Sequence, residues 1–366
     1  MHELYPRKYL SCKNITDCKP LEVSKSLQSK ISVVYIRLMK REILRALEEK
    51  RGEYISGEEL AGSFRVSRAA VWKAVESLRK EGHRITAITN KGYMLEAASD
   101  ILTAGGISSH LKAGTKVSRV ICLGEVDSTN NYAKKLAMNG EPHGTLVAAN
   151  LQTAGRGRRG HSFESPAGTG LYMSLILRPN CDAGKFQMIT AASAVAVCLA
   201  IEELYPDLRG SLGIKWVNDV YLRGKKISGI LTEAVTGFES GEIESVITGI
   251  GVNVSTKKFS GEISQTAGAI LNDDDIRFGR DELCAKIADY VMTFADNIDD
   301  LGIIRAYRER SILTGREISY MNGSEKCYGH VEGIDDEGGL VVRNAEGVTE
   351  TLRSGEVFMI RSEEEK

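Results

Sequence analysis

The stretch best suited to chemistry is "GRGRRG" at residues 155–160, which places Arg156, Arg158 and Arg159 among three glycines. Guanidinium groups are planar donors that match carboxylates and phosphates. Glycine loses more backbone entropy on ordering than any other residue. We therefore expect a loop with no fixed shape of its own that closes over an anionic small molecule. A nucleic-acid contact of the arginine–glycine type and an ordinary surface turn are the alternatives.

Three other stretches carry small polar or charged side chains. "DSTN" at residues 127–130 precedes a helical pattern, where such side chains cap the helix or bind a small polar ligand; alone, a cap is the commoner case. Small residues in the strand-like "ITGIGVN" at 247–253 mark the close approach of a ligand or another backbone. A hairpin pattern at 215–231 carries the charged and amide residues Lys215, Asn218, Asp219, Lys225 and Lys226.

Length and composition limit the class of protein. A chain of 366 residues is too long for one hydrophobic core, so two or three domains are expected. The net charge of −1 argues against coating nucleic acid but allows one local basic patch. Seven cysteines without a C-x-x-C pair indicate neither a disulfide framework nor a zinc site. With no apolar run near ~18 residues and no secretory signal pattern, we expect a cytoplasmic chain and no membrane partner.

Residues 39–98 carry patterns for three helices and a hairpin. Ser56 and Glu59 predict a capping box at the second helix, and Ser67 is suited to cap the third. The motif "TNKG" at 89–92 predicts the turn of the hairpin. We therefore predict a winged helix-turn-helix, although Arg65 stands near the place where its turn often carries glycine.

The same segment is locally basic. From residue 65 to residue 91 seven Lys or Arg face two Glu, a local charge of +5. We expect DNA contacts from Arg68, Trp72, Lys73, Arg79 and Lys91. The alternative is a three-helix protein-interaction module with a solvated basic face.

Residues 99–308 alternate strand and helix patterns, which predicts a sheet domain with helices on one side. The long apolar run at 188–204 is expected to be a buried helix. From residue 309, short alternating runs broken by turns indicate a small β barrel or sandwich. Residues 1–38 show no clear period and are expected to be a disordered extension or to precede a natural start at Met39.

In order and approximate spacing, "DSTN", "GRGRRG", "KW-ND", "GKKISGIL" and "GIGVN" resemble the motifs of biotin protein ligases. The winged helix is typical of the bifunctional form, which also represses biotin-synthesis genes. The resemblance covers residues 39–361 and implies an α+β multi-domain fold. The implied domains are a winged helix-turn-helix at 39–98, a mixed-sheet ligase domain of the biotin/lipoate type at 99–308 and an SH3-like β barrel at 309–366.

The resemblance also implies roles for individual residues. Lys226 and Arg158 would face the biotin carboxylate and the α-phosphate of ATP, and Asp219 would orient the acceptor lysine. The biotin contacts would be Ser128, Thr129, Asn130, Gln152, Gly155, Arg156, Gly157, Arg158, Lys226, Gly229 and Gly249. The ATP or adenylate contacts would be Arg158, Arg159, Asn218, Lys226 and Asn253. The sequence departs from the family pattern at Val217, usually proline, and at Phe163, often tryptophan.

The implied reaction needs no enzyme nucleophile. ATP with Mg²⁺ would convert the biotin carboxylate to biotinyl-5′-adenylate, and a lysine of a biotin carboxyl carrier protein would attack the anhydride. The adenylate would also act as corepressor for operator DNA, with a homodimer forming when it is bound.

Two other functions compete with this one. A lipoate–protein ligase shares the domain type, and a metabolite-sensing transcription factor would bind without catalysing. The presence of Lys226, Arg158 and Asp219 argues against the sensor. The family implies that the C-terminal part serves acceptor docking and adenylate contacts; a packing module is the alternative.

Overall fold

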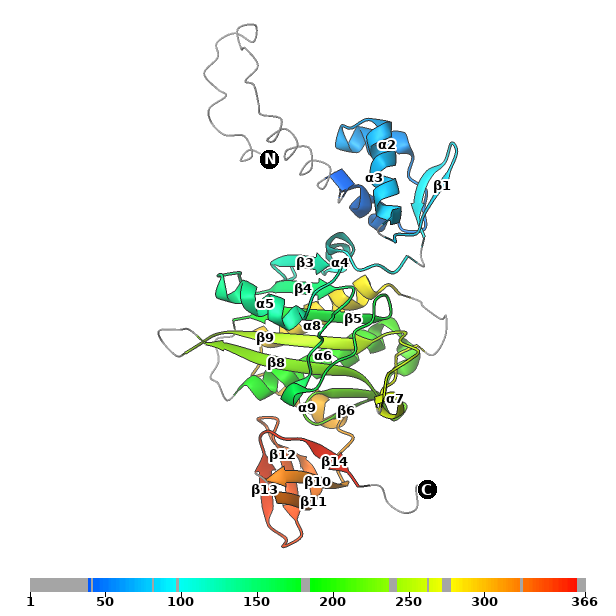
Figure 1. Ribbon diagram of the computed structural model, residues 1–366. Coiled ribbons are helices and arrows are strands. Elements are labelled where there is room, and N and C mark those ends of the chain that lie inside the picture. Colours follow the sequence, from blue (N-terminus) through cyan, green and yellow to red (C-terminus); the bar gives the residue numbers. More distant parts are fainter. Residues whose placement is uncertain are drawn as a thin grey trace.

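Figure 1 shows three successive parts: an N-terminal helical unit, a central sheet with helices and a C-terminal set of strands. The computed structural model describes residues 39–40, 42–80, 82–96, 99–178, 185–236, 242–261, 263–271, 278–322 and 325–360. The expected extension over residues 1–38 lies outside the described residues.

The N-terminal unit is the predicted winged helix-turn-helix. Residues 39–40 and 42–49 are helical, followed by α2 (Gly57–Phe64), α3 (Arg68–Lys80) and the antiparallel pair β1 (Ile85–Ile88) and β2 (Gly92–Leu95). Its separate core includes Ile43, Leu47, Val71, Val75 and Leu78. These are the apolar positions that the helical period places on inward faces.

In this unit the predicted capping box forms only in part, and the predicted turn forms at Arg65. The Ser56 hydroxyl accepts from the Glu59 amide at 2.9 Å, but the Glu59 carboxylate contacts Lys50 instead of completing a capping box. Arg65 ends α2 in the left-handed conformation, with φ of 53°. The expected turn therefore forms without glycine. Arg65 adopts the left-handed conformation there, which is less favourable for arginine than for glycine.

The central sheet has seven strands in the order β3-β4-β5-β9-β8-β7-β6. Among these described strands only β3 and β4 run parallel, so the sheet is mixed, as predicted. The strands are β3 (Arg119–Leu123), β4 (Thr145–Ala149), β5 (Gly170–Leu177), β6 (Leu212–Lys215), β7 (Asp219–Leu222), β8 (Lys225–Thr236) and β9 (Ile243–Asn253).

Helices cover both faces of this sheet, which corrects the expectation of helices on one side. Leu146 and Ala148 of β4 belong to the cluster with α6 (Phe186–Leu204) and α8 (Arg280–Asp296), whereas Val147 packs with α5 (Thr129–Met138). Successive strand residues point to opposite faces, so α5 must lie opposite α6 and α8.

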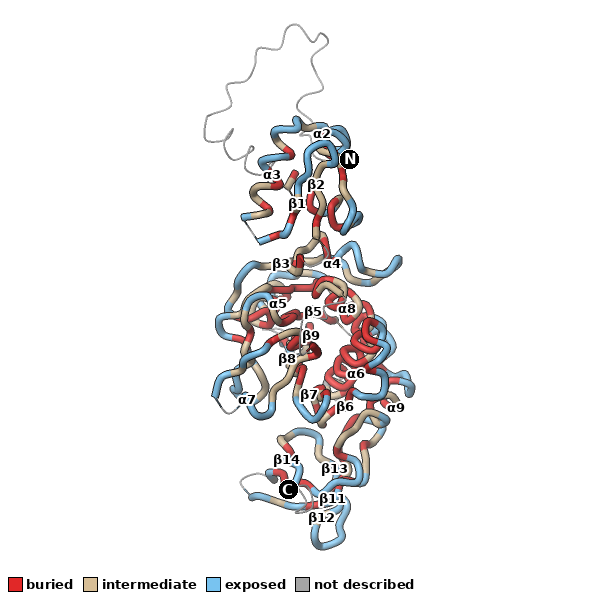
Figure 2. The backbone as a smooth tube through the Cα atoms, turned by 90° about the vertical axis from the view of Figure 1, so that its right-hand side faces the viewer, coloured by how far each residue is buried: buried red, intermediate tan, exposed pale blue. Residues whose placement is uncertain are grey.

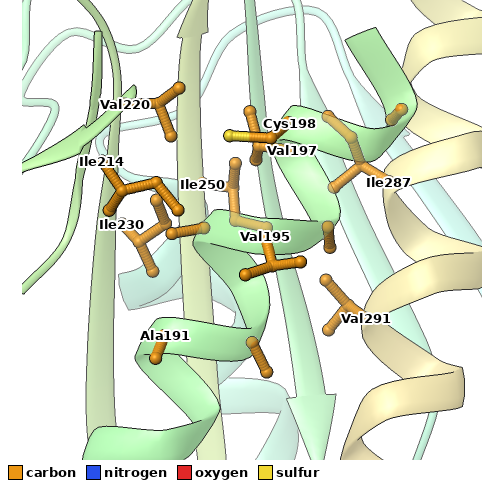
Figure 3. Packing of buried hydrophobic residues seen from close by; sticks show 14 of the residues in the cluster. Ala191, Val195, Val197, Cys198, Ile214, Val220, Ile230, Ile250, Ile287 and Val291 are labelled. Atoms are coloured by element: carbon orange, nitrogen blue, oxygen red, sulfur yellow. The ribbon is translucent and has the colours of Figure 1, made fainter. Parts of the chain in front are cut away.

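Helix α6 is apolar all round because it lies between the sheet and a second helix layer. Figure 3 shows Val195 of α6 beside Ile230 and Ile250 of the sheet and Val291 of α8. In Figure 2 the buried positions run through the sheet and this helix. Among the described helices, α6 is long and apolar enough to span a membrane, but 83% of the stretch Gln187–Leu204 is buried inside the protein.

Short helices complete the central part: α4 (Ala104–His110), α7 (Ile263–Thr266) and α9 (Leu301–Glu309), with the 3-10 turns Arg158–Gly160 and Pro206–Leu208. The indole of Trp216 donates to Gly338 O at 2.9 Å, from the central part to the C-terminal one. The two parts therefore share one continuous core.

The C-terminal strands form one five-stranded antiparallel sheet in the order β13-β12-β11-β10-β14. They are β10 (Glu317–Asn322), β11 (Glu325–Ile334), β12 (Leu340–Asn344), β13 (Thr349–Leu352) and β14 (Val357–Met359). A small β-rich domain was predicted and is found; the SH3-like form stays a prediction.

Candidate functional site

A small pocket opens beside the start of α5, between β8, β9 and the arginine loop. It is lined by Ser128, Thr129, Asn130, Gln152, Arg156, Phe163, Gly229, Leu231, Gly249, Ile250 and Gly251. The empty space among these residues, part of which is open solvent, is about 300 Å³. Seven of the eleven lining residues are predicted biotin contacts. The fold brings them together from segments that lie about 120 residues apart in the sequence.

Polar groups at one end of the pocket hold each other in place. Gln152 accepts from the backbone amide of Thr129 at 2.8 Å and donates to the Ser165 hydroxyl at 2.9 Å. The Ser174 hydroxyl contacts the Thr129 hydroxyl at 2.8 Å. Ser128 begins α5 but makes no side-chain cap, so its buried hydroxyl remains available to a ligand.

The side chain of Asn130 lies against the Gly249 backbone. A Cβ at Gly249 would stand 2.0 Å from Asn130 Oδ1, so any side chain there would displace the amide. The amide accepts from Ser174 at 2.7 Å and donates to the carboxylate of Glu233 at 2.9 Å. Gly249 thus makes room for a buried amide in the pocket wall.

Phe163 forms the neighbouring wall. A Cβ at Gly251 would lie 2.6 Å from its ring, and one at Gly155 would lie 2.3 Å from its carbonyl oxygen. Glycine at position 251 therefore lets the aromatic ring approach β9 closely, and glycine at position 155 lets the loop pass close to the Phe163 backbone. Gly155 supports this wall and, unlike Phe163, does not line the pocket.

Lys226 and Asp219 form an ion pair on the β7–β8 hairpin, with 2.8 Å between Nζ and Oδ1. Asp219 Oδ1 makes no directed hydrogen bond, so the contact is electrostatic. A Cβ at Gly229, which faces Asp219 across the ladder, would lie 3.3 Å from Lys226 Cε. Because Gly229 also lines the pocket, the ion pair adjoins it.

Arg158 brings a second cation to this hairpin. Its Nη1 donates to the side-chain oxygen of Asn218 at 3.3 Å, and Asn218 is fixed by donating to Ile230 O at 3.0 Å. Burial, reinforced by the charge of Arg159 and opposed by Asp219, lowers the pKa of Arg158 from its usual value. An anion placed beside Arg158 would therefore stabilise the charged form of its guanidinium.

The arginine loop adopts a hairpin, although we expected no fixed shape. The Gly157 amide donates to His161 O at 2.7 Å, and the Phe163 amide donates to Gly155 O at 2.9 Å. These bonds join the two arms of the loop, which offsets the entropy of its glycines. Arg159 stands at the tip with φ of 52°.

The remaining predicted site residues lie around the pocket. Asn253, at the end of β9, is buried and donates to Gly268 O at 3.0 Å, which fixes the following loop near Lys226. Lys226, Arg158, Arg159, Asn218 and Gly157 do not line the pocket itself. At Val217, where the sequence departs from the family, the Trp216–Val217 peptide bond is cis.

The predicted DNA contacts divide into two groups. Arg68, Trp72 and Lys73 are exposed on α3, and the first two line a groove together with wing residues of the β1–β2 hairpin. Lys91 lies at the wing, 5.8 Å from the ring centre of Tyr54. Arg79 instead donates to Ile85 O and Glu76, which joins α3 to the wing.

Sequence reasoning missed several groups that shape the pocket. Gly251 lies two residues from Gly249 on the same strand face, a spacing that the strand period could have revealed. Ser174 is one polar residue in an otherwise apolar strand, which is also a readable signal. Glu233 carries no motif, and only the fold brings it to Asn130.

Family models match three parts of the chain. The Biotin/lipoate A/B protein ligase family matches residues 123–253, an HTH domain matches 40–94, and the Biotin protein ligase C terminal domain matches 315–360.

Whole proteins and solved structures match as well. The bifunctional ligase/repressor BirA of Bacillus subtilis is 34% identical over 85% of this chain and 95% of its own length. BirA of Escherichia coli is 29% identical over the same shares. The structure of a biotin protein ligase from Aquifex aeolicus in complex with biotin and ATP matches with a TM-score of 0.55 at 28% identity, over 67% of this chain and 100% of that one.

Proposed function

Because this chain belongs to the biotin protein ligase family in its bifunctional ligase–repressor form, we propose how its own residues perform each function. The chain is an ATP-dependent biotin ligase and a DNA-binding repressor. The observation that carries the ligase assignment is a small glycine-lined pocket whose wall adjoins the Lys226–Asp219 ion pair. It provides a slot lined by glycines and polar side chains, beside a lysine ammonium that a substrate carboxylate can approach.

We assign the polar end of the pocket to the ureido head of biotin. Ser128, Thr129 and Gln152 present hydroxyl and amide groups there, while Phe163 packs on the apolar ring. Asn130 closes the wall, and Gly155 and Gly157 let the loop bend around the ligand. Since the polar groups are already oriented by one another, binding would order few additional side chains.

The carboxylate of biotin would extend toward Lys226 and Arg158. Its oxygen attacks the α-phosphorus of ATP, a P–O bond forms, and pyrophosphate leaves. Mg²⁺ bound to ATP would supply positive charge that offsets the charge of the phosphate oxygens. Lys226 and Arg158 supply fixed positive charge as negative charge gathers on the α-phosphate. Arg159, Asn218 and Asn253 are assigned to the nucleotide side of the same site.

In the second half-reaction an acceptor lysine attacks the acyl carbonyl, the C–N bond forms and AMP leaves. We assign Asp219 to hold the incoming amine because its carboxylate lies beside Lys226, next to pocket residue Gly229. The acceptor is a biotin carboxyl carrier protein. We propose that the reaction takes place in the cytoplasm, where ATP and operator DNA are both found.

The direct experiment for the first half-reaction is biotin-dependent exchange of labelled pyrophosphate into ATP. We expect exchange that requires both biotin and Mg²⁺ and that lipoate does not support. Exchange with lipoate in preference to biotin would contradict the substrate assignment. Biotin binding without any exchange would indicate a sensor that lacks the chemistry.

DNA binding is expected to depend on the exposed residues of α3. Arg68→Ala and Lys73→Ala should each weaken binding to the upstream region of the biotin genes. A variant that removes one phosphate interaction should lower the slope of log affinity against log salt concentration by about 0.9. Fluorescence anisotropy titrations at several salt concentrations measure both quantities.

Arg45→Ala is the control for this prediction. Arg45 is exposed on the first helix and pairs with Glu49, so its loss removes a cation from the same domain away from α3. An equal loss of affinity in Arg45→Ala would mean that general charge, and not α3, governs binding.

We also propose that the adenylate-bound protein dimerises and presents two α3 helices to two half-sites. Closing the arginine loop over the adenylate would present a fixed surface to a second subunit. Sedimentation velocity with and without biotinyl-5′-adenylate tests this proposal. We expect the mass to double on binding; an unchanged mass at micromolar protein would contradict the coupling.

A further inference from the structure

A carboxylate outside the predicted site contacts two of its residues. Glu233, near the end of β8, accepts from Arg156 Nη2 at 2.9 Å and from Asn130 Nδ2 at 2.9 Å. Arg156 Nη1 adds a longer contact at 3.3 Å, so both carboxylate oxygens are engaged. The Glu233 side chain is 20% exposed and that of Arg156 is 42% exposed, so the contact with Asn130 is better shielded from water than the contact with Arg156.

Both partners of Glu233 line the pocket. Asn130 is the buried amide that occupies the space left by Gly249. Arg156 begins the arginine loop, and a bridge pairs it with Ser162 on the returning arm. Asn131 secures the guanidinium from a third direction, accepting from Arg156 Nη1 at 2.7 Å.

We propose that Glu233 is a positioning residue for biotin binding, acting through Asn130 and Arg156 without touching the ligand. This inference rests on the proposed function, because it concerns the same pocket. The carboxylate holds one wall amide in its orientation and anchors the base of the arginine loop. It also neutralises Arg156, which leaves Arg158 as the loop cation directed at the substrate anion.

The chemistry of the contact requires a carboxylate. Arg156 and Asn130 direct three N–H groups at Glu233, and an ionised carboxylate only accepts. A glutamine in its place has the same shape but one accepting oxygen, so its own NH₂ group would meet a donor. Glu233→Gln therefore loses a hydrogen bond to Arg156 or to Asn130 without a change in side-chain volume.

The test compares Glu233→Gln with Glu141→Gln in the full-length chain. Glu141 pairs with Arg119 and is also 20% exposed, but it lies outside the pocket. Because hydrogen bonds to charged groups are worth about tenfold to a hundredfold in binding, we expect at least about a tenfold higher biotin Kd in Glu233→Gln. Release of biotinyl-5′-adenylate should be faster by a similar factor. The rate of adenylate formation at saturating biotin and ATP should change less than about twofold.

Glu141→Gln should match the unmodified protein in all three measurements, and both variants should melt at similar temperatures. Equal biotin Kd and adenylate release in the two variants would overturn the positioning role. Equal losses in both would show a general effect of removing a carboxylate.

If Glu233→Gln does not fold, Arg156→Lys takes its place, because an ammonium cannot span Glu233 and Asn131. An unchanged biotin Kd in Arg156→Lys would likewise overturn the proposal. If the wild-type chain bound biotin but formed no adenylate, only the proposed function would be contradicted. The biotin Kd would still test the positioning role of Glu233.

Discussion

Lys226→Ala is expected to slow adenylate formation by about 10²–10³, the usual loss when one fixed charge that stabilises a transition state is removed. Lys226 Nζ lies 2.8 Å from Asp219 Oδ1 beside the pocket, so its ammonium is in position before the substrates arrive. Because this positive charge is already in position, the side chain does not have to move when the α-phosphorus becomes five-coordinate. Rapid quenching of a single turnover with labelled ATP measures the step directly.

Two companion variants sharpen this result. Lys225→Ala removes the neighbouring, exposed lysine of the same hairpin and should leave the rate within about twofold, because surface charges contribute little. Lys226→Arg keeps the charge with a different shape and should recover part of the lost rate. If Lys226→Ala and Lys225→Ala slowed the reaction equally, the hairpin would contribute only general charge.

Gly249→Ala is expected to weaken biotin binding by at least about 100-fold. The new Cβ would stand 2.0 Å from Asn130 Oδ1, so the amide must leave its place. Overpacking costs about 1–3 kcal/mol, and unsatisfied buried groups cost a similar amount. The displaced amide would also enter the pocket. Isothermal titration calorimetry with biotin, below the melting temperature of the variant, measures the loss.

Gly333→Ala is the matched control for the glycine substitution. Gly333 also lies in a strand, β11, but a Cβ there would meet nothing within 4 Å. We expect unchanged biotin affinity in this variant. Near-normal affinity in Gly249→Ala would show that Asn130 is free to move, and the pocket wall described above would be wrong.

The elements that the sequence predicts well are those whose signals are local. Ser56 caps α2 as its type predicts, and Val71, Val75 and Leu78 face the core of the winged helix as the helical period requires. The hairpin that carries Asp219 and Lys226 turns at Arg223 and Gly224, both with positive φ. Such signals need only a few neighbouring residues.

The second helix layer was missed although the strands carried a sign of it. All five residues of β4 and all eight of β5 are buried, so neither strand has a polar face. A strand buried on both sides needs cover on both sides. The apolar runs at these strands were therefore evidence for a helix on the face that α5 covers.

The walls of the pocket could not be read from short motifs. Asn130 meets Leu231 and Glu233, which are 101 and 103 residues away, and Arg156 meets Glu233 across 77 residues. Each motif marked one residue of such a contact. The fold alone brings Arg156 to Glu233 and Arg158 to Asn218 of the β7–β8 hairpin.

This chain activates biotin and transfers it to protein. The most direct test of this activity is transfer of labelled biotin to a purified carboxyl carrier domain, with ATP and Mg²⁺ and with lipoate as competitor. We predict one biotin per acceptor lysine, no transfer without ATP and no effect of lipoate. Tight biotin binding with neither adenylate nor labelled carrier would contradict the claim and leave a repressor that senses biotin without ligating it.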